Sequence, residues 1–425
     1  MTPTQWMLSA GFVALLMLRV PFAIALAAST VGGLLLSDIE LTVFAQRMIS
    51  GTQSFSLLAV PFFILAGDLM TAGGLSRRLV ATADVLVRHR TGGLGIVTVL
   101  AATFFAAISG SAPATTAAIG VIMIPEMSKR GYDPAFATAL AVAGGIIGPI
   151  IPPSIILIIW GVMAEQSIAR LFLAGIVPGV LLSIGLMAVC WWHARRTGVP
   201  REEPATWNET IHAFRDGKWA LLAPLIILGG IYGGIVTPTE AAVVAVVYAL
   251  AVGFFAYREL TLRELPKILA SSLRTTAIVM FILVAANGFG WLIALERMPD
   301  KVAALFAGLS EHHYVLLLCL NVLLLAIGCV MDNLAAMTIL ATILIKIGNQ
   351  IGMDPIQLGA MVSINFTIGM ATPPFGYALF VGAAVSKLPI GAISRPLMPM
   401  LLVMAIVLAI VTYIPAATLW VQRLM

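Results

Sequence analysis

Apolar stretches recur along the whole chain, and they limit what it can fold into more than any other feature. Hydrophobic residues make up 60% of the 425 residues and charged residues only 10%, whereas a soluble domain carries about a quarter charged residues. The stretch 219–256 is long enough for two crossings of a bilayer, and 397–420 for another. Because backbone in hydrocarbon must satisfy its own hydrogen bonds, we expect an all-α, polytopic membrane protein.

The basic residues predict an orientation rather than a nucleic-acid partner. The formal net charge is +5, but the 24 Lys and Arg residues are scattered through short loops and form no dense patch. An odd number of crossings, with the N-terminus on the periplasmic side, places most of these residues on the cytoplasmic side. We therefore expect the lipid bilayer, and no nucleic acid, as the surroundings of this chain.

A four-residue motif recurs at a fixed distance and indicates an internal repeat. GYDP at 131–134 returns as GMDP at 352–355, an offset of 221 set by Gly131 and Gly352. Several further Gly and Pro residues coincide in the same register: Gly67 with Gly288, Gly148 with Gly369, Pro153 with Pro374, and Pro178 with Pro399. A shared register of this kind predicts two related halves.

The predicted halves are residues 1–192 and 219–425, joined by a polar cytoplasmic linker at 193–218. The orientation above places the first copy of the motif inside and the second copy outside. The repeats are therefore expected to be inverted, which is the architecture of many secondary transporters.

Each half contains two polar, Gly- or Pro-containing interruptions. In the first half, SGSAPATT lies between apolar limbs that are too short to cross the bilayer, which predicts a re-entrant helical hairpin near 96–124. GPIIPPS then predicts a broken transmembrane helix near 135–164. The repeat places the second hairpin near 314–350, around VMDNLA, and the second broken helix near 355–385, around GMATPPF.

The interruptions expose groups that bind ions of both signs. Free carbonyls and Ser, Thr, Asn or Asp oxygens suit a hard cation such as Na⁺, whereas half-helix N-termini suit a carboxylate. The candidate Na⁺ ligands are Ser109, Gly110, Gly148, Asp332, Asn333, Gly369 and Thr372. The candidate substrate-binding residues are Ser111, Thr115, Pro153, Ser154, Thr372 and Pro374.

Structural roles compete with these assignments. An Asp or Asn after a break is suited to capping a helix, and small hydroxyl residues also pack helices closely. Asp332 is the acid at the centre of its interruption, and an acid at membrane depth is a functional candidate by default. Asn287, Asn321 and Asn365, which stand in apolar stretches, are expected to make interhelical hydrogen bonds.

Five motifs together resemble the large membrane subunit of tripartite ATP-independent periplasmic (TRAP) transporters. They are SFSLLAVPFFILAGDLM at 54–70, SGSAPATTAAIG at 109–120, GGIIGPIIPPSI at 144–155, TPTEAA at 237–242 and ATPPFGYALFV at 371–381. The resemblance extends over nearly the whole chain, and the set is more specific than any member.

The resemblance implies a function and a set of partners. Such subunits act in the bacterial inner membrane with a small four-helix membrane subunit and a soluble periplasmic substrate-binding protein. They import organic acids, often C4-dicarboxylates or acidic sugars, by symport with Na⁺. Their fold has a scaffold and an elevator-type transport domain. The small subunit is expected to be a separate polypeptide here.

Two other functions were weighed. A self-sufficient Na⁺- or H⁺-coupled anion carrier would share the hairpins and broken helices but need no binding protein. An intramembrane serine hydrolase needs a base beside Ser109 or Ser111, and every histidine lies in or beside a polar loop. With no Walker A motif for ATP either, we expect a transporter and not an enzyme.

Overall fold

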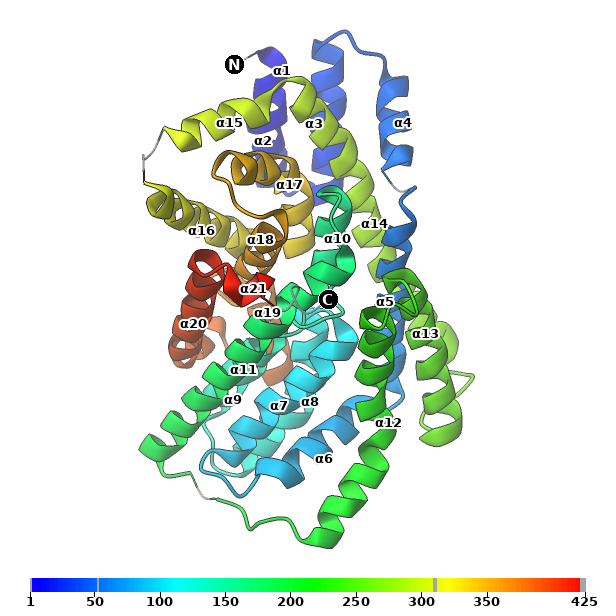
Figure 1. Ribbon diagram of the computed structural model, residues 1–425, viewed down its shortest axis with the longest axis vertical. Helices are drawn as coiled ribbons and strands as arrows, with labels where there is room; N and C mark the ends of the chain where they lie inside the picture. The colour runs from blue at the N-terminus through cyan, green and yellow to red at the C-terminus, as the bar shows by residue number, and fades with distance from the viewer. Residues whose placement is uncertain (1, 52, 200, 309–311, 421–425) are drawn as a thin grey trace.

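The computed structural model describes residues 2–51, 53–199, 201–308 and 312–420, and these residues form helices and connecting loops (Figure 1). Pro200 of the predicted linker and residues 421–425 of the predicted second half lie outside this description. Within it, six helical stretches are long and apolar enough to cross a bilayer: Phe55–Ala72, Ile168–Thr197, Pro238–Ala256, Leu265–Leu295, His313–Val330 and Ile390–Tyr413.

The N-terminal elements pack against the long helix α14. The elements before the first hairpin are α1 (Pro3–Trp6), η1 (Met7–Gly11), α2 (Phe12–Met17), α3 (Phe22–Leu36), α4 (Leu41–Ser50), η2 (Phe55–Leu58), α5 (Ala59–Ala72) and α6 (Leu75–Val87). A separate apolar cluster joins Leu8 and Phe12 to Phe289 and Leu292 of α14 (Leu265–Leu295). The Phe12 and Phe289 rings lie 5.5 Å apart between centroids, so aromatic packing secures the N-terminal helices.

Two series of five helices keep the 221-residue offset of the sequence repeat. The first series is α7 (Gly93–Ser109), α8 (Ala112–Lys129), α9 (Pro134–Gly145), α10 (Ile155–Met163) and α11 (Ile168–Thr197). The second is α16 (His313–Val330), α17 (Asn333–Gln350), α18 (Pro355–Gly369), α19 (Tyr377–Ser386) and α20 (Ile390–Tyr413), followed by α21 (Ala416–Leu419). The α7–α8 pair lies in the lower part of Figure 1 and the α16–α17 pair in the upper part.

The recurring DP dipeptide starts a helix in both series. The Asp133 side chain caps α9 by accepting a hydrogen bond from the backbone N–H of Ala135 at 3.1 Å. Asp354 caps α18 in the same way, accepting from Ile356 at 2.8 Å. The proline that follows each Asp occupies the first helical position, where its missing N–H costs nothing. The motif thus marks the start of a helix, and both of its copies have a capping role.

The stretch between the two series is mainly helical. Helix α11 extends to Thr197 and α12 (Trp207–Tyr232) begins ten residues later, so both ends of the predicted linker are helical. The remaining elements are α13 (Pro238–Ala251), η3 (Val252–Ala256) and α15 (Met298–Ala307). The motif TPTE forms a capping box at the start of α13, where Thr237 and Glu240 each bond the other's backbone N–H.

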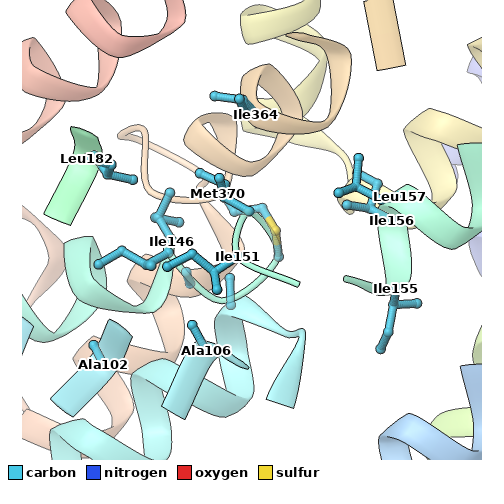
Figure 2. Packing of buried hydrophobic residues seen from close by; sticks show 14 of the residues in the cluster. Ala102, Ala106, Ile146, Ile151, Ile155, Ile156, Leu157, Leu182, Ile364 and Met370 are labelled. Atoms are coloured by element: carbon cyan, nitrogen blue, oxygen red, sulfur yellow. The ribbon is translucent and has the colours of Figure 1, made fainter. Parts of the chain in front are cut away.

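The segments 146–154, between α9 and α10, and 370–376, between α18 and α19, are called the first and the second break. Small side chains allow close packing around the first break. Figure 2 shows Ile146 and Ile151, from the segment between α9 and α10, lying over Ala102 and Ala106 of α7. All four side chains are buried, and Met370 of the second break lies beside Ile146. The two breaks therefore belong to one apolar core rather than to two separate ones.

A charged cluster joins α6 to α12 and to the loop before α14. The Arg78 guanidinium donates to Glu259 Oε1 at 2.6 Å and lies 3.2 Å from Asp216 Oδ2. It also stacks 3.7 Å from the centre of the Tyr257 ring. Because the Arg78 side chain is only 16% exposed, these interactions are less screened than those of a surface pair.

Replacing Arg78 with alanine is expected to destabilise the protein by about 2 kcal/mol, because two carboxylates and the ring lose a shared partner. The matched control is Arg77→Ala. Arg77 pairs with the same Glu259 at 3.7 Å but is 73% exposed, so its loss should cost less than about 0.5 kcal/mol. Thermal unfolding of both variants in detergent measures the difference, and equal melting temperatures would contradict the assignment.

Candidate functional site

A cavity of about 610 Å³ lies where the tips of the two hairpins meet α5 and α14. Five of the predicted site residues line it: Ser109, Gly110 and Ser111 at the α7–α8 tip, and Asp332 and Asn333 at the α16–α17 tip. The α7–α8 pair lies in the lower part of Figure 1 and the α16–α17 pair in the upper part, and their tips line the same cavity. The fold thus brings together segments that are far apart in sequence.

The first tip is a compact set of oxygens. The Ser109 hydroxyl lies 2.7 Å from the Thr115 hydroxyl, which also donates to the Ser111 carbonyl at 2.8 Å. Ser109 and Thr115 are both buried. A Cβ on Gly148 would lie 2.7 Å from the Thr115 hydroxyl, so this glycine lets the first break approach the tip. Four predicted residues therefore adjoin one another, and their oxygens are of the kind that bind a small hard cation.

Pro153 and Ser154 lie behind this tip rather than among the residues that line the cavity. The Ser154 hydroxyl donates to the Pro149 carbonyl at 2.5 Å and accepts from the Leu157 N–H at 3.4 Å. Ser154 is fully buried and is the N-cap of α10. The peptide bond between Pro152 and Pro153 is cis. In this structure the first break reaches the cavity through other residues, Pro149, Ile155 and Ile156.

Asp332 combines a capping role with a place in the cavity wall. Its Oδ2 atom accepts hydrogen bonds from the Leu334 and Ala335 backbone N–H groups, at 3.0 and 3.5 Å. The capping alternative is therefore confirmed, and Asp332 is at the same time one of the cavity-lining residues. The positive end of the α17 dipole offsets part of its negative charge. Asn333, which follows it, is buried in the same wall.

The second break contacts the back of its hairpin. The Cys329 thiol, whose residue also lines the cavity, donates to the Thr372 carbonyl at 3.2 Å, and the Thr372 hydroxyl donates to Ile368 at 2.9 Å. A Cβ on Gly369 would lie 2.8 Å from the backbone nitrogen of Cys329. Gly369, Thr372 and Pro374 are not among the cavity-lining residues, whereas their neighbours Met370 and Phe375 are.

Asp68 is a cavity-lining acid that the sequence reasoning missed. It lies on α5, and its Oδ2 atom accepts a hydrogen bond from the Ser272 hydroxyl of α14 at 2.6 Å. Thr275, one turn further along α14, lines the cavity too. The available signal was the position of Asp68 inside an apolar stretch, because an acid there is costly and marks a functional candidate.

Two of the three asparagines of the apolar helices, Asn321 and Asn365, form a buried network, as predicted. Asn365 of α18 donates from its side-chain nitrogen to Asn321 Oδ1 of α16 at 2.8 Å. Asn321 in turn donates to the Thr412 hydroxyl of α20 at 3.0 Å. These interhelical hydrogen bonds hold α16, α18 and α20 together behind the second tip, so they support the cavity without lining it.

The polar groups in the lining of the cavity are carboxyl, hydroxyl and amide groups. Its described lining contains two carboxyl groups, several hydroxyls and an amide, but no Lys, Arg or His. The Ser109 hydroxyl is paired with Thr115, so no base is placed to activate it. Within the described ranges, no cluster of three or more His, Cys, Asp and Glu residues forms a transition-metal site.

Comparison with known proteins identifies the family. Residues 9–417 match the family described as "Tripartite ATP-independent periplasmic transporter, DctM component". The chain is 43% identical over 376 residues to the 2,3-diketo-L-gulonate TRAP transporter large permease protein YiaN of Escherichia coli, covering 88% of each chain. It is 42% identical over 386 residues to the C4-dicarboxylate TRAP transporter large permease protein DctM of Pseudomonas aeruginosa, covering 91% of this chain and 90% of that protein.

A third relative is longer than this chain. The isethionate TRAP transporter permease protein DctMQ of Oleidesulfovibrio alaskensis is 41% identical over 409 residues, which are 96% of this chain but 64% of that protein. The chain thus spans less than two thirds of this relative's length.

Solved structures share the fold. The Alcanivorax borkumensis YdaH transporter superposes with a TM-score of 0.66 at 16% identity, covering 90% of this chain and 89% of that one. Neisseria gonorrhoeae MtrF gives a TM-score of 0.62 at 14% identity, covering 90% and 84%. The named sequence relatives are transporter permeases and not enzymes, which confirms that prediction. The chain therefore belongs to the DctM family and is a multi-pass large permease component of a TRAP transporter.

Proposed function

We propose that this permease imports an organic acid across the bacterial inner membrane by symport with Na⁺. The observation that carries the proposal is the cavity in which both hairpin tips and α5 meet, because it gathers oxygen ligands for cations and backbone N–H groups for an anion. The relatives named for 2,3-diketo-L-gulonate and for C4-dicarboxylates support an acidic substrate.

The charge of the cavity wall supports the proposal of sodium coupling. An organic anion would enter a space that holds Asp68 and Asp332 and whose described lining offers no basic side chain. Repulsion between like charges grows as water is excluded, so cations bound at the tips would have to offset it. The Ser109 hydroxyl and the Asp332 carboxylate are the proposed cation ligands, with Gly110, Gly148, Asn333, Gly369 and Thr372 supplying backbone or amide groups nearby. Ser111 and Thr115 are proposed to bind the substrate.

The matching helix series support an inverted-repeat transporter. We propose that α7–α8 and α16–α17 are re-entrant hairpins, that α9–α10 and α18–α19 are broken transmembrane helices, and that these parts move together as an elevator. The scaffold would then be formed by α3, α5, α13 and α14, which contact one another extensively. The N-terminus is proposed to be periplasmic.

The partners are proposed from the family. A periplasmic binding protein would deliver the acid, and a small four-helix membrane subunit, as a separate polypeptide, would complete the complex. Both proposals concern the whole transporter rather than any single residue described above.

Uptake by proteoliposomes containing the permease, the small subunit and the binding protein tests the proposal. An inward Na⁺ gradient should raise uptake at least about tenfold over an equal K⁺ gradient, because cations must compensate the charge in the cavity. Uptake that ignores the Na⁺ gradient would overturn the coupling. Equal uptake without the binding protein would instead favour the self-sufficient carrier.

A further inference from the structure

The two acids of the cavity are neutralised to different degrees. Asp332 accepts hydrogen bonds from two backbone N–H groups at the start of α17, so the helix dipole offsets its charge. The Asp68 carboxylate accepts one hydrogen bond, from the neutral Ser272 hydroxyl, and no ion pair joins it to any basic residue in the described ranges. In its ionised form, Asp68 therefore places a largely uncompensated negative charge on the α5 wall.

Asp68 also lies close to the proposed binding region. The preceding residue, Gly67, packs against the first hairpin tip, and a Cβ on it would lie 3.5 Å from the Ser109 Cα atom. Thr275 extends the same wall along α14. A molecule held at the hairpin tips within this cavity of about 610 Å³ is thus exposed to the Asp68 charge.

The chemistry of a carboxylate decides which substrate groups it tolerates. An ionised carboxylate has only acceptor atoms, so it accepts a hydrogen bond from a substrate hydroxyl and repels a second carboxylate. Ser111, Thr275, Asn333 and Tyr377 add neutral hydrogen-bonding groups to the cavity wall. These groups suit a hydroxylated body, and the volume is within the range of pockets for small organic ligands.

We propose that Asp68 sets the charge of the transported acid: the permease accepts a hydroxylated monocarboxylate and discriminates against the dicarboxylate of the same length. The inference rests on the proposed function, which it narrows to a substrate class. Asp68 acts as a specificity-determining residue on the α5 wall, whereas the hairpin tips hold the single carboxylate and its cations.

Matched pairs of acids test this directly on the purified permease with its small subunit in nanodiscs. Each pair differs by one charge at equal chain length: gluconate and glucarate, galactonate and galactarate, succinamate and succinate. Affinities are measured by thermal stabilisation in NaCl and in choline chloride. In the pairs that bind, the monoanion should bind at least about tenfold more tightly to the wild-type protein, as expected for one added like charge.

Two variants assign the effect to Asp68. In Asp68→Asn the carboxylate becomes a neutral amide of the same size, so the dianion should gain affinity and the gap within each pair should fall below about threefold. In Ser272→Ala the carboxyl group remains and only its hydrogen bond is lost, so at about pH 8, where the carboxyl group is ionised, the monoanion should stay preferred. If Asp68→Asn does not fold, Asp68→Ser provides a second neutral variant.

The outcomes separate the inference from the proposed function. Equal binding of both members of each pair to the wild-type protein, a preference for the dianion, or an unchanged gap in Asp68→Asn would overturn the charge rule while leaving sodium-dependent acid binding in place. If no acid in the panel stabilises the wild-type protein in either salt, the substrate class inferred here is wrong, whereas the proposed function is decided separately by the Na⁺ dependence of uptake in proteoliposomes. Monoanion preference that disappears in Asp68→Asn and persists in Ser272→Ala supports the inference.

Discussion

Replacing Asp332 with alanine is expected to lower Na⁺-driven uptake by at least about a hundredfold, because the change leaves a bound cation without its charged partner. The loss has two parts that must be separated. Asp332 caps α17, and removal of a cap costs about 1 kcal/mol of stability. It also lines the cavity as a proposed cation ligand.

Asp354 supplies the matched control. It caps α18 by accepting from the Ile356 and Gln357 N–H groups at 2.8 and 3.2 Å, and it is not among the cavity-lining residues. Asp354→Ala should therefore lose a similar amount of stability but keep most of its uptake. Proteoliposome uptake and thermal unfolding are measured on both variants. If both lose uptake equally, the role of Asp332 is that of a cap alone.

Gly110→Ala is the second substitution with a large expected effect. Gly110 has a left-handed φ of +61°, and a Cβ there would overlap the Pro153 carbonyl of the first break. The strain of a left-handed residue costs about 1–2 kcal/mol, and the overlap additionally forces the tip away from the break. Since small displacements of a binding group have large effects on rate, uptake should fall roughly tenfold or more.

Gly352 separates these two contributions. Its φ is +68°, yet nothing lies within 4 Å of the position a Cβ would take. Gly352→Ala should thus lose stability through backbone strain but retain uptake close to the wild-type rate. The comparison uses uptake per amount of reconstituted protein together with the melting temperature. A Gly110→Ala protein that transports normally would mean that the contact with Pro153 has no part in transport.

The sequence predicts the helical architecture and much of the cavity. The offset between Gly131 and Gly352 predicts where the helices of the second series begin from those of the first series. This works because Gly and Pro residues act on the backbone next to them. The same locality explains why the interruptions before Ala112 and Asn333 were found: a break is visible in the sequence itself. Both hairpin tips then proved to line one cavity.

The orientation of individual side chains could not be read from the sequence. Ser154 and Thr372 have suitable chemistry, but local bonds to Pro149 and Ile368 use their hydroxyls behind the cavity. Asp68 was not predicted for the site, although its side chain is among those that line the cavity. Its importance depends on α5 packing beside a hairpin tip that follows it in the chain, and on Ser272, which is about two hundred residues away. Such contacts exist only in the folded chain.

The thiol of Cys329 is a natural labelling site in the wall of this cavity. Cys329 lines the cavity at the end of α16, whereas Cys190 is fully buried among the helices of the first series. In a Cys319→Ala background, which removes the other partly exposed thiol, a membrane-permeant maleimide that enters the cavity therefore meets one thiol at the hairpin tip. Because that thiol bonds the Thr372 carbonyl, the rate at which it is alkylated reports how often hairpin and break separate.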